Sequence, residues 1–341
     1  MVLNKNNKEI RRLYLCIYAL AFLLIIVGAL SLYNFNTYSS LYSRVLSLSN
    51  HTTISNSSHT LVQVNTTVGQ RLTNIDVPFN SSELSIINNG PSSYYELAGL
   101  MLLNNTLQNS VFLSSVNKSN VYNSIIINGK PSVIYIGALS CIFCGENRWA
   151  MALALSRFGN FTKLYKGYSS FGDGDLPTIY WNNYNYTTSS NVGYGNYYTS
   201  KYINFLSADY ESPVRLGFEM KPISFFVQHA PNATYFKAMN FMNSSNKYQG
   251  TPFVLWGNVI YEGADAVILG NNTPSAPPYP LELMSHADVL RQLQTFNSSF
   301  AYSEYAAADV YISYICSSIN NNASVCSLPA IHTIEQLSNL S

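Results

Sequence analysis

The stretch GKPSVIYIGALSCIFCGENRWAMALAL, residues 129–155, contains the features that decide the fold. Residues 132–137 form a short, nearly continuous apolar run, which is typical of a buried strand. Residues 146–158 combine good helix formers with apolar side chains at helical spacing, so they predict a helix. Cys141 and Cys144 lie between the two, at the junction of the predicted strand and the predicted helix.

Two hairpins are predicted, one just before this stretch and one far after it. Residues 124–127 form an apolar run, and the Asn-Gly pair at 128–129 supplies the positive φ angles that a tight hairpin needs. Residues 252–256 form a second apolar strand, which Asn258 can turn into residues 259–261. The chain is therefore expected to form at least two short antiparallel strand pairs.

The rest of the chain adds mostly helical patterns. Residues 84–87 are a candidate short strand, residues 92–107 show a weak helical pattern, and residues 281–296 and 302–319 predict two closing helices. The Tyr-, Asn- and Gly-rich middle, about residues 161–248, is expected to hold strands and helices joined by long loops. A strand, a helix, an insertion, a second hairpin and terminal helices together predict an α/β or α+β sandwich.

The composition is nearly uncharged. Charged residues make up 10% of the 341 residues, the net charge is +1, and 27 tyrosines accompany a large excess of Asn and Ser. No nucleic-acid partner is expected, because no basic patch is large enough to neutralise phosphates. A neutral surface of this kind suits a glycosylated exterior, or an acidic medium in which carboxylates are protonated.

Residues 13–33, LYLCIYALAFLLIIVGALSLY, predict a membrane anchor. The run carries no charge, and about 20 such residues span a bilayer as a helix. Basic residues precede the run, and none follows until Arg44, so the positive-inside rule places the N-terminus in the cytoplasm and the remainder outside. A cleaved signal peptide is the alternative, although its apolar region is usually about 7–15 residues long. The expected location is the cell membrane, as a single-pass protein.

The expected domain organisation follows from this anchor. Residues 1–12 are a cytoplasmic N-terminus, 13–33 the transmembrane anchor, 34–91 a Ser/Thr/Asn-rich stalk, 92–330 the extracytoplasmic domain and 331–341 a C-terminal tail. The stalk shows no sustained helical period and has the composition of a loosely ordered spacer.

Sequons for N-glycosylation are frequent after the apolar run, and none precedes it, which agrees with an outer location. An Asn- and Ser-rich chain also creates sequons by chance. The candidate acceptors are Asn50, Asn56, Asn65, Asn80, Asn104, Asn117, Asn160, Asn185, Asn232, Asn243, Asn271, Asn297, Asn322 and Asn339.

The Cys141-x-x-Cys144 pair suits thiol–disulfide chemistry because of its place. The first turn of a helix has unpaired N–H groups and a partial positive charge, and both favour a thiolate over a thiol. A two-residue spacer brings the two sulfurs close enough for a disulfide. We therefore predict that an accessible Cys141 attacks a partner disulfide and that Cys144 resolves the mixed intermediate.

Other roles would use the same two cysteines. They are a structural disulfide, half of a zinc site, a vestigial redox motif on a binding domain, and copper transfer, since soft thiolates select Cu(I). Zinc would need two further Cys or His at matching spacing. The sequence has no second Cys-x-x-Cys and no His-x-x-x-His, so no metal is expected.

Cys316 and Cys326 enclose a short Asn-rich loop near the C-terminus. Outside the cytoplasm two such cysteines most often form a structural disulfide, and a loop near ten residues would contribute on the order of 2–3 kcal/mol. A second redox pair is the less expected alternative. Cys16, inside the apolar run, is expected to be an inert apolar residue.

Several segments carry a family resemblance. They are Gly129-Lys130-Pro131, Tyr135-Ile136-Gly137-Ala138, the Cys141 and Cys144 pair, Glu146, Arg148-Trp149, Leu155-Ser156-Arg157-Phe158-Gly159, Tyr198-x-Ser200-x-Tyr202-x-x-Phe205, Thr251-Pro252-Phe253, Cys316 and Cys326. Together they resemble an archaeal family of membrane-anchored thioredoxin-like proteins, labelled only as domain of unknown function 929. The resemblance covers most of the chain from about Ser124 to Cys326. The family often has Pro after the first cysteine, where this chain has Ile142, and it has no established activity.

The resemblance implies an α/β thioredoxin-like sandwich, with an insertion between the Cys-x-x-Cys helix and a cis-Pro strand and with a transmembrane helix before it. Thioredoxin-like proteins place a cis-proline opposite the cysteine pair, so the resemblance implies that Thr251 and Pro252 shape the substrate groove. An ordinary trans proline at the start of a strand is the alternative. The order is also similar to that of the periplasmic disulfide oxidoreductases, which carry a long insertion before the proline.

The sequence thus predicts a membrane-anchored extracytoplasmic thiol–disulfide oxidoreductase that acts on secreted or surface proteins without an organic cofactor. Arg148 and Trp149 are expected to pack or pair behind the site. The alternative is a surface glycoprotein that uses a thioredoxin-like scaffold for binding or assembly, with the cysteine pair as a staple.

Overall fold

The structure is a computed structural model, and its described residues are 77–104, 124–139, 141–169, 176–183, 192–210, 221–245, 252–262, 281 and 284–338. All of them lie in the second of the two compact units of the chain, Thr66–Ser341. The predicted cytoplasmic segment, the transmembrane anchor and Cys16 fall outside the described residues. Among the residues that are described, no helix has the length and apolar character to cross a membrane.

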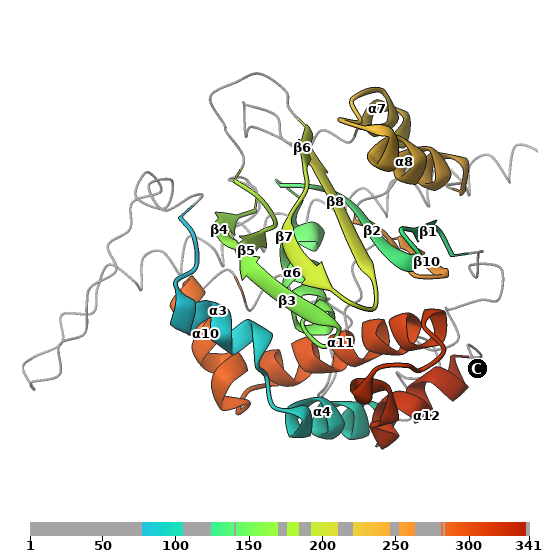
Figure 1. Cartoon of the computed structure of the whole chain (residues 1–341). Coiled ribbons are helices and arrows are strands. Elements are labelled where there is room, and N and C mark those ends of the chain that lie inside the picture. Colours follow the sequence, from blue (N-terminus) through green and yellow to red (C-terminus); the bar gives the residue numbers. More distant parts are fainter. Residues whose placement is uncertain are drawn as a thin grey trace, which may run out of the picture. The chain divides into compact units, whose positions relative to one another are not determined.

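A mixed six-stranded sheet forms the centre of this unit (Figure 1). The strand order is β10-β9-β2-β8-β6, and the short β1 pairs with the start of β2. Strands β2 and β8 are parallel, whereas β9, β10 and β6 are antiparallel to their neighbours. The strand bounds are β1 Ile126–Ile127, β2 Lys130–Ala138, β6 Val192–Tyr194, β8 Asn204–Tyr210, β9 Phe253–Trp256 and β10 Val259–Glu262.

Two small sheets lie in the segment that connects β2 to β8. In one, β3 pairs with β7, and in the other, β4 pairs with β5. Their bounds are β3 Gly159–Lys163, β4 Tyr165–Tyr168, β5 Pro177–Tyr180 and β7 Tyr197–Ser200. The predicted insertion after the cysteine-bearing helix therefore contains short antiparallel strand pairs in its described part.

Helices cover both faces of the central sheet. The helices α4, α6, α10, α11 and α12 share one hydrophobic core with one face, while α7 and α8 share a second core with the other. Figure 1 shows α7 and α8 apart from the α4, α11 and α12 group. The bounds are α3 Ser81–Asn88, α4 Ser92–Asn104, α6 Ile142–Leu155, α7 Ile223–Gln228, α8 Ala233–Ser245, α10 His286–Thr295, α11 Ser299–Ser318, η3 Ser324–Ser327 and α12 Pro329–Leu337.

Strand β2 is apolar on both sides because it has a core on each side. Val133 and Tyr135 belong to the core beneath α6 and α11, whereas Ile134 and Ile136 belong to the core beneath α7 and α8. All four side chains are fully buried. This two-sided burial explains why the sequence shows a continuous apolar run here instead of the alternation of a half-exposed strand.

Both predicted hairpins are present. Asn128 and Gly129 have φ angles of 49° and 75°, and they join Ile127 to its cross-strand partner Lys130. The second hairpin turns at Gly257, whose φ is 66°, and at Asn258. A left-handed backbone conformation of this kind favours Gly and Asn.

One predicted element is wrong, and helices are found in the segments predicted as the stalk and the C-terminal tail. Residues 84–87, expected as a short strand, lie in helix α3, which begins with a capping box in which Asn80 and Glu83 exchange hydrogen bonds. Ile87 on this helix is fully buried, so the last part of the predicted stalk is packed into the core. The predicted C-terminal tail likewise begins inside α12, where Ile331 is fully buried.

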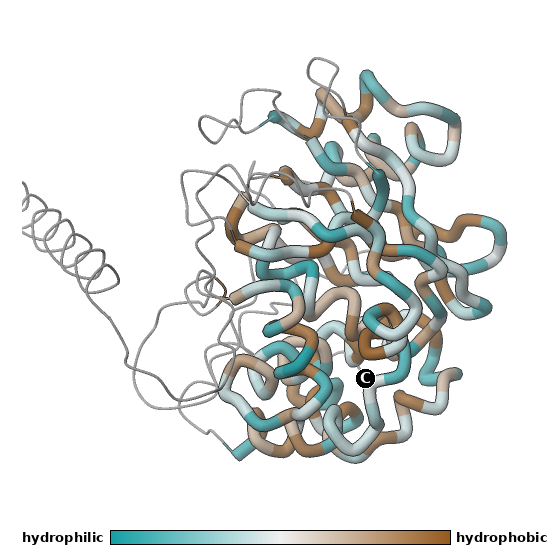
Figure 2. Tube along the Cα trace, turned by 90° about the vertical axis from the view of Figure 1, so that its left-hand side faces the viewer, coloured by the Kyte–Doolittle hydropathy of each residue, from teal (hydrophilic) through white to brown (hydrophobic). Residues whose placement is uncertain are grey.

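Charged residues make up only 10% of the sequence, and polar and apolar residues are interspersed along the fold (Figure 2). Figure 2 shows short hydrophobic segments alternating with pale and hydrophilic ones along the tube. Seven of the candidate glycan acceptors lie among the described residues, and all seven are exposed. They are Asn80, Asn104, Asn160, Asn232, Asn243, Asn297 and Asn322. Their exposure is compatible with glycosylation, which stays a prediction.

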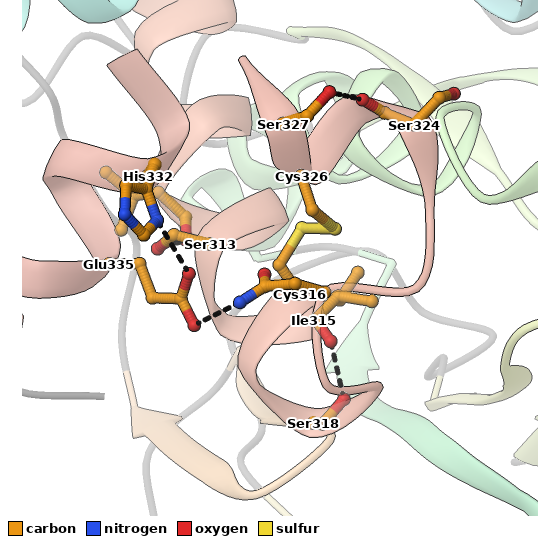
Figure 3. The surroundings of a disulfide bond; sticks show 11 residues. Ser313, Ile315, Cys316, Ser318, Ser324, Cys326, Ser327, His332 and Glu335 are labelled. Atoms are coloured by element: carbon orange, nitrogen blue, oxygen red, sulfur yellow. Dashed lines mark hydrogen bonds and ion pairs between the residues drawn. A yellow bond between two sulfur atoms is a disulfide. The ribbon is translucent and has the colours of Figure 1, made fainter. Parts of the chain in front are cut away.

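Cys316 and Cys326 form a disulfide, in agreement with the predicted pairing (Figure 3). The bond joins the last turn of α11 to η3, and the two Cα atoms are 5.6 Å apart. Both cysteines are buried in the core that α6 and α11 share. Beside the loop, the Asn321 amide donates a hydrogen bond to Glu335, which ties the loop to α12.

Candidate functional site

The cysteine pair lies at the corner between β2 and α6. The Cys141 amide donates to the carbonyl of Ala138, the last residue of β2, at 3.3 Å. Cys141 is the N-cap of α6, and its sulfur accepts a hydrogen bond from the Cys144 amide at 3.4 Å. Here the sulfur takes the place that a Ser or Asp oxygen takes in an ordinary cap, among the unpaired N–H groups of the first turn. A negative charge on Cys141 is favoured at this position.

Neither Cys141 nor Cys144 is part of a disulfide in this structure, and both are buried. Cys141 is 2% exposed and Cys144 is fully buried, so the prediction of an accessible Cys141 is wrong for this conformation. The physical reason is packing, because Ala138, Cys141 and Cys144 form a small cluster of their own. Between the cysteines, Phe143 is 43% exposed and marks where the corner reaches the surface.

The surroundings hold Cys144 in the thiol form. Burial raises the pKa of the Cys144 thiol well above its ordinary value, and the hydrogen bond and negative charge of Cys141 raise it further. The positive charge of Arg148 acts in the opposite direction and lowers this pKa. The two sulfurs therefore differ in chemistry. The N-cap Cys141 is suited to act as a nucleophile, whereas the buried Cys144 is suited to stay a protonated thiol.

A buried ion pair lies behind the cysteines. Arg148 follows Cys144 by one turn on α6, and its Nη2 donates to Asp209 Oδ1 at 2.7 Å and to the Ala138 carbonyl at 3.0 Å. Both charged side chains are fully buried. The guanidinium also lies 5.6 Å from the ring centre of Tyr135 and 5.8 Å from that of Tyr180. The expectation that Arg148 pairs behind the site is thus met.

Gly137 creates the space for this arrangement. It pairs with Asp209 across β2 and β8, and it lies on the same face of β2 as Tyr135, two residues earlier. A Cβ atom at Gly137 would overlap the Tyr135 phenol and would lie 2.9 Å from Asp209 Oδ1. Glycine is required here because the tyrosine ring lies along the strand towards the ion pair.

The β4–β5 hairpin closes one side of the corner. Thr178 donates to the Gly145 carbonyl at 2.6 Å, and Trp149 Nε1 donates to the Pro177 carbonyl at 3.0 Å. His286 packs behind this hairpin with its Nε2 2.9 Å from the Thr178 carbonyl. Burial lowers the pKa of His286 to about 4, which keeps the imidazole neutral.

Pro252 lies at the same end of the sheet as the cysteines. Phe253 pairs with Ile136, so the preceding Pro252 lies beyond that pair, at the end of β2 from which the chain continues to Cys141. Pro252 is buried. Thr251, the other residue of the predicted groove, is outside the described residues, and the groove stays a prediction.

Sequence reasoning missed two kinds of buried polar residue. One is the partner of Arg148, Asp209, which lies 61 positions away and carries no local signal. The other is a set of buried acids on α11: Glu304 faces Glu146 of α6, and Asp309 lies near Glu96 of α4. Acidic residues inside apolar helices were the available signal. In the described part of the chain, no group of three or more His, Cys, Asp or Glu is placed to hold a metal ion.

Comparison with known proteins gives one family. A family model whose description is "Domain of unknown function (DUF929)" matches residues 116–317. This range begins before β1 and ends inside α11, so it includes the cysteine corner and the whole central sheet. Neither the curated proteins nor the solved structures include a significant match.

Proposed function

Because the chain belongs to the DUF929 family, whose description assigns no activity, we propose a function from the geometry of the site. The protein is a membrane-anchored, extracytoplasmic thiol–disulfide oxidoreductase that acts on secreted or surface proteins. The observation that carries this proposal is the position of Cys141, whose sulfur caps α6 and accepts the Cys144 amide at 3.4 Å.

The order of elements supports a thioredoxin-like form of the α/β fold. A buried strand leads into the cysteine-bearing α6, the chain returns through an insertion to a parallel strand, and the proline-led β9–β10 hairpin pairs with the first strand. The helix α11 then packs on α6. This is the order that a thioredoxin-like sandwich with an insertion before its proline strand requires.

Three features support an extracytoplasmic location. The apolar run at 13–33 follows a cluster of basic residues, as the positive-inside rule requires for an outer main domain. The described sequon asparagines are exposed. The disulfide between Cys316 and Cys326 is of a kind that forms and persists mainly in oxidising compartments.

The chemistry is a pair of exchange steps. The Cys141 thiolate attacks a client disulfide, a Cys141–client bond forms, and one client sulfur leaves as a thiolate with the electron pair. Cys144 then releases its proton to water and attacks the Cys141 sulfur, which closes the Cys141–Cys144 bond and releases the second client thiolate. The client gains two electrons and the protein loses two, and the reverse sequence oxidises a client dithiol.

The test is a trap variant. Cys144→Ser removes the resolving sulfur, so oxidised glutathione is expected to convert Cys141 into a stable mixed disulfide that intact-protein mass spectrometry detects. Cys141→Ser is the matched control, because it keeps the buried Cys144 and is expected to react far more slowly. Equal and negligible reaction of both variants in the folded state, with full reaction after denaturation, would contradict the proposal.

One observation favours a second candidate function. Cys141 is 2% exposed and Cys144 is fully buried, as expected of a packed staple in a surface glycoprotein that serves binding or assembly. A staple would form one disulfide that resists mild reductant. An oxidoreductase would open that bond at low concentrations of a dithiol, and the rate of opening therefore separates the two candidates.

A further inference from the structure

Arg148 is a buried charge beside the cysteine corner, and burying a charge away from water costs free energy. Its side chain is fully buried, and of its three guanidinium nitrogens only Nη2 makes a hydrogen bond within the described part of the chain. Its Nε and Nη1 are buried without a hydrogen-bond partner there. Buried donors are almost always satisfied, so two unsatisfied donors on one buried cation need an explanation.

Packing alone is a weak explanation for this arrangement. Replacing a buried ion pair by apolar residues of similar volume is often neutral or stabilising, because removing two charges from water is expensive. Asp209 meets the guanidinium through one oxygen at 2.7 Å, on Nη2 alone, which is not the bidentate geometry that makes such pairs strong. The charge is held in place while part of its hydrogen-bonding capacity stays unused.

The guanidinium of Arg148 is placed close enough to the sulfur of Cys144 for its charge to act on it. Arg148 lies one turn after Cys144 on the same helix, and residues at this spacing are neighbours on one helix face. Its Nη2 donates to the Ala138 carbonyl, and Ala138 packs with Cys141 and Cys144 in one cluster. A thiolate formed at Cys144 would therefore arise in a buried site with a cation directly behind it.

We propose that Arg148 is a positioning residue of the redox pair: it holds a positive charge behind Cys144 that stabilises the transient Cys144 thiolate, and Asp209 limits how much of that charge the sulfur experiences. This inference rests on the proposed function and names a residue that works through Cys144 without touching the client. The lowering effect of Arg148 on the pKa of Cys144 agrees with it.

The thiolate arises in a defined step. When a client thiolate attacks the Cys141 sulfur of the oxidised pair, a client–Cys141 disulfide forms, the Cys141–Cys144 bond breaks, and Cys144 leaves with the electron pair. The client sulfur is oxidised and the Cys144 sulfur is reduced, and Cys144 then takes a proton from water. A leaving thiolate of lower pKa leaves faster, so a cation behind Cys144 speeds this opening.

Within the described part of the chain, four other titratable or charged groups act around this sulfur and its cation. Cys141 lies beside Cys144, Tyr135 of β2 and Asp209 of β8 act on Arg148, and Tyr180 of β5 presents its ring to the guanidinium. Burial raises the pKa of Tyr135 well above its ordinary value, so it stays neutral at physiological pH. Asp209 is therefore the group whose replacement most directly changes the net charge behind Cys144.

The experiment uses substitutions that change the net charge behind Cys144 in opposite directions. Asp209→Asn leaves Arg148 uncompensated, whereas Arg148→Met combined with Asp209→Asn removes both charges and leaves none buried alone. Arg148→Lys keeps the positive charge. Two quantities are measured on the full chain: the rate at which reduced glutathione opens the oxidised pair, and the pH midpoint for alkylation of Cys144 in a Cys141→Ser background.

The expected results form a pattern that a structural role would not produce. Asp209→Asn speeds opening and lowers the Cys144 midpoint by about one pH unit, the double variant slows opening and raises the midpoint by about one unit, and Arg148→Lys stays near the parent. Changes in unfolding free energy with both quantities constant would overturn the inference. If the parent pair never forms a disulfide, the proposed function fails, while the midpoints still test the role of Arg148.

Discussion

At the scale of single residues, the two cysteines differ by what surrounds each sulfur. Cys141 takes the N-cap position and accepts a backbone amide, whereas Cys144 is enclosed and its thiol has a pKa well above the ordinary value, chiefly through burial. An asymmetry of this kind separates an attacking sulfur from a resolving one. The asymmetry arises although the two cysteines are only three residues apart, because the N-cap and the first turn of α6 give their side chains different environments.

The first prediction concerns the proton on Cys144. In a Cys141→Ser variant, alkylation of Cys144 is expected to follow a pH midpoint above the roughly 8.5 of a free cysteine, because burial is the largest cause of the raised pKa and is retained. The measurement is the alkylation rate by mass spectrometry from pH 6 to pH 11 while circular dichroism reports the fold. A midpoint below 8 would show that burial does not dominate.

The second prediction concerns Gly137. Gly137→Ala is expected to lower the free energy of unfolding by about 1–3 kcal/mol, the usual cost of overpacking, because the new methyl overlaps the Tyr135 phenol. Urea denaturation checks this value. In a Tyr135→Val background the same substitution should cost clearly less, since the ring is gone. An equal loss of unfolding free energy in both backgrounds would show that the new methyl group clashes with a group other than Tyr135.

At the scale of elements, local patterns predicted what is locally encoded. The Asn128-Gly129 turn, the buried run of β2 and the helix formers of α6 each act over a few residues, and all three elements are present. Helix α3 was mistaken for a strand because its short apolar run is ambiguous. The Asn80 and Glu83 capping box was the signal that would have identified it.

The sequence patterns did not predict which strands and side chains pair over long distances in the chain. The parallel partner of β2 is β8, which follows a long insertion, and its Asp209 meets Arg148 across 61 positions. No local spacing encodes such a contact. The same limit applies to the burial of Cys141, because the strand-to-helix junction predicts the N-cap position but not the side chains that pack over it.

The third prediction concerns the link between α11 and η3. Replacing Cys316 and Cys326 together by Ala is expected to lower the free energy of unfolding by about 2–3 kcal/mol, as loop-closure entropy predicts for this separation. Thermal and urea unfolding of the oxidised protein measure it. The double variant should leave the chemistry of Cys141 unchanged. Loss of glutathione reactivity at Cys141 would instead make the second pair part of the redox site.

At the scale of the whole molecule, the low content of charged residues is accompanied by acids buried inside the helical layer. Burial raises the pKa of Glu304 well above its ordinary value, and the facing Glu146 raises it further. Burial also raises the pKa of Asp309, with Glu96 adding to the effect. Both acids keep their protons in the folded state where an unfolded chain has lost them.

The fourth prediction follows from these acids. Their contribution to stability is complete below about pH 4 and is lost as pH rises towards the raised folded pKa values, because over that range only the unfolded state releases the protons. His286, with a pKa lowered to about 4, acts oppositely and loses its contribution as pH falls below about 6.5. Stability should therefore decline as pH rises above about 5, and more steeply above about pH 6.5, where the opposing contribution of His286 no longer changes.

At low pH the stability is expected to fall again, because other groups lose their contribution there. The pKa of Glu83 is lowered, with Lys166 and the Asn80 amide both acting in that direction, so its contribution is lost as pH falls through the folded pKa. Urea midpoints from pH 3 to pH 8 measure the whole profile. Glu304→Gln with Asp309→Asn should flatten the decline. A maximum at pH 7 or above in the parent protein would contradict this account and the suggested suitability for an acidic medium.

The central claim is that Cys141 and Cys144 exchange between dithiol and disulfide in the folded protein. The most direct test is an equilibrium titration in glutathione buffers of increasing oxidised fraction, with acid quenching and peptide mass spectrometry to count each bond. The account predicts a reversible transition of this pair while the Cys316–Cys326 bond stays closed and the fold persists. A pair that stays in one state at every buffer ratio, and changes only on unfolding, would contradict it.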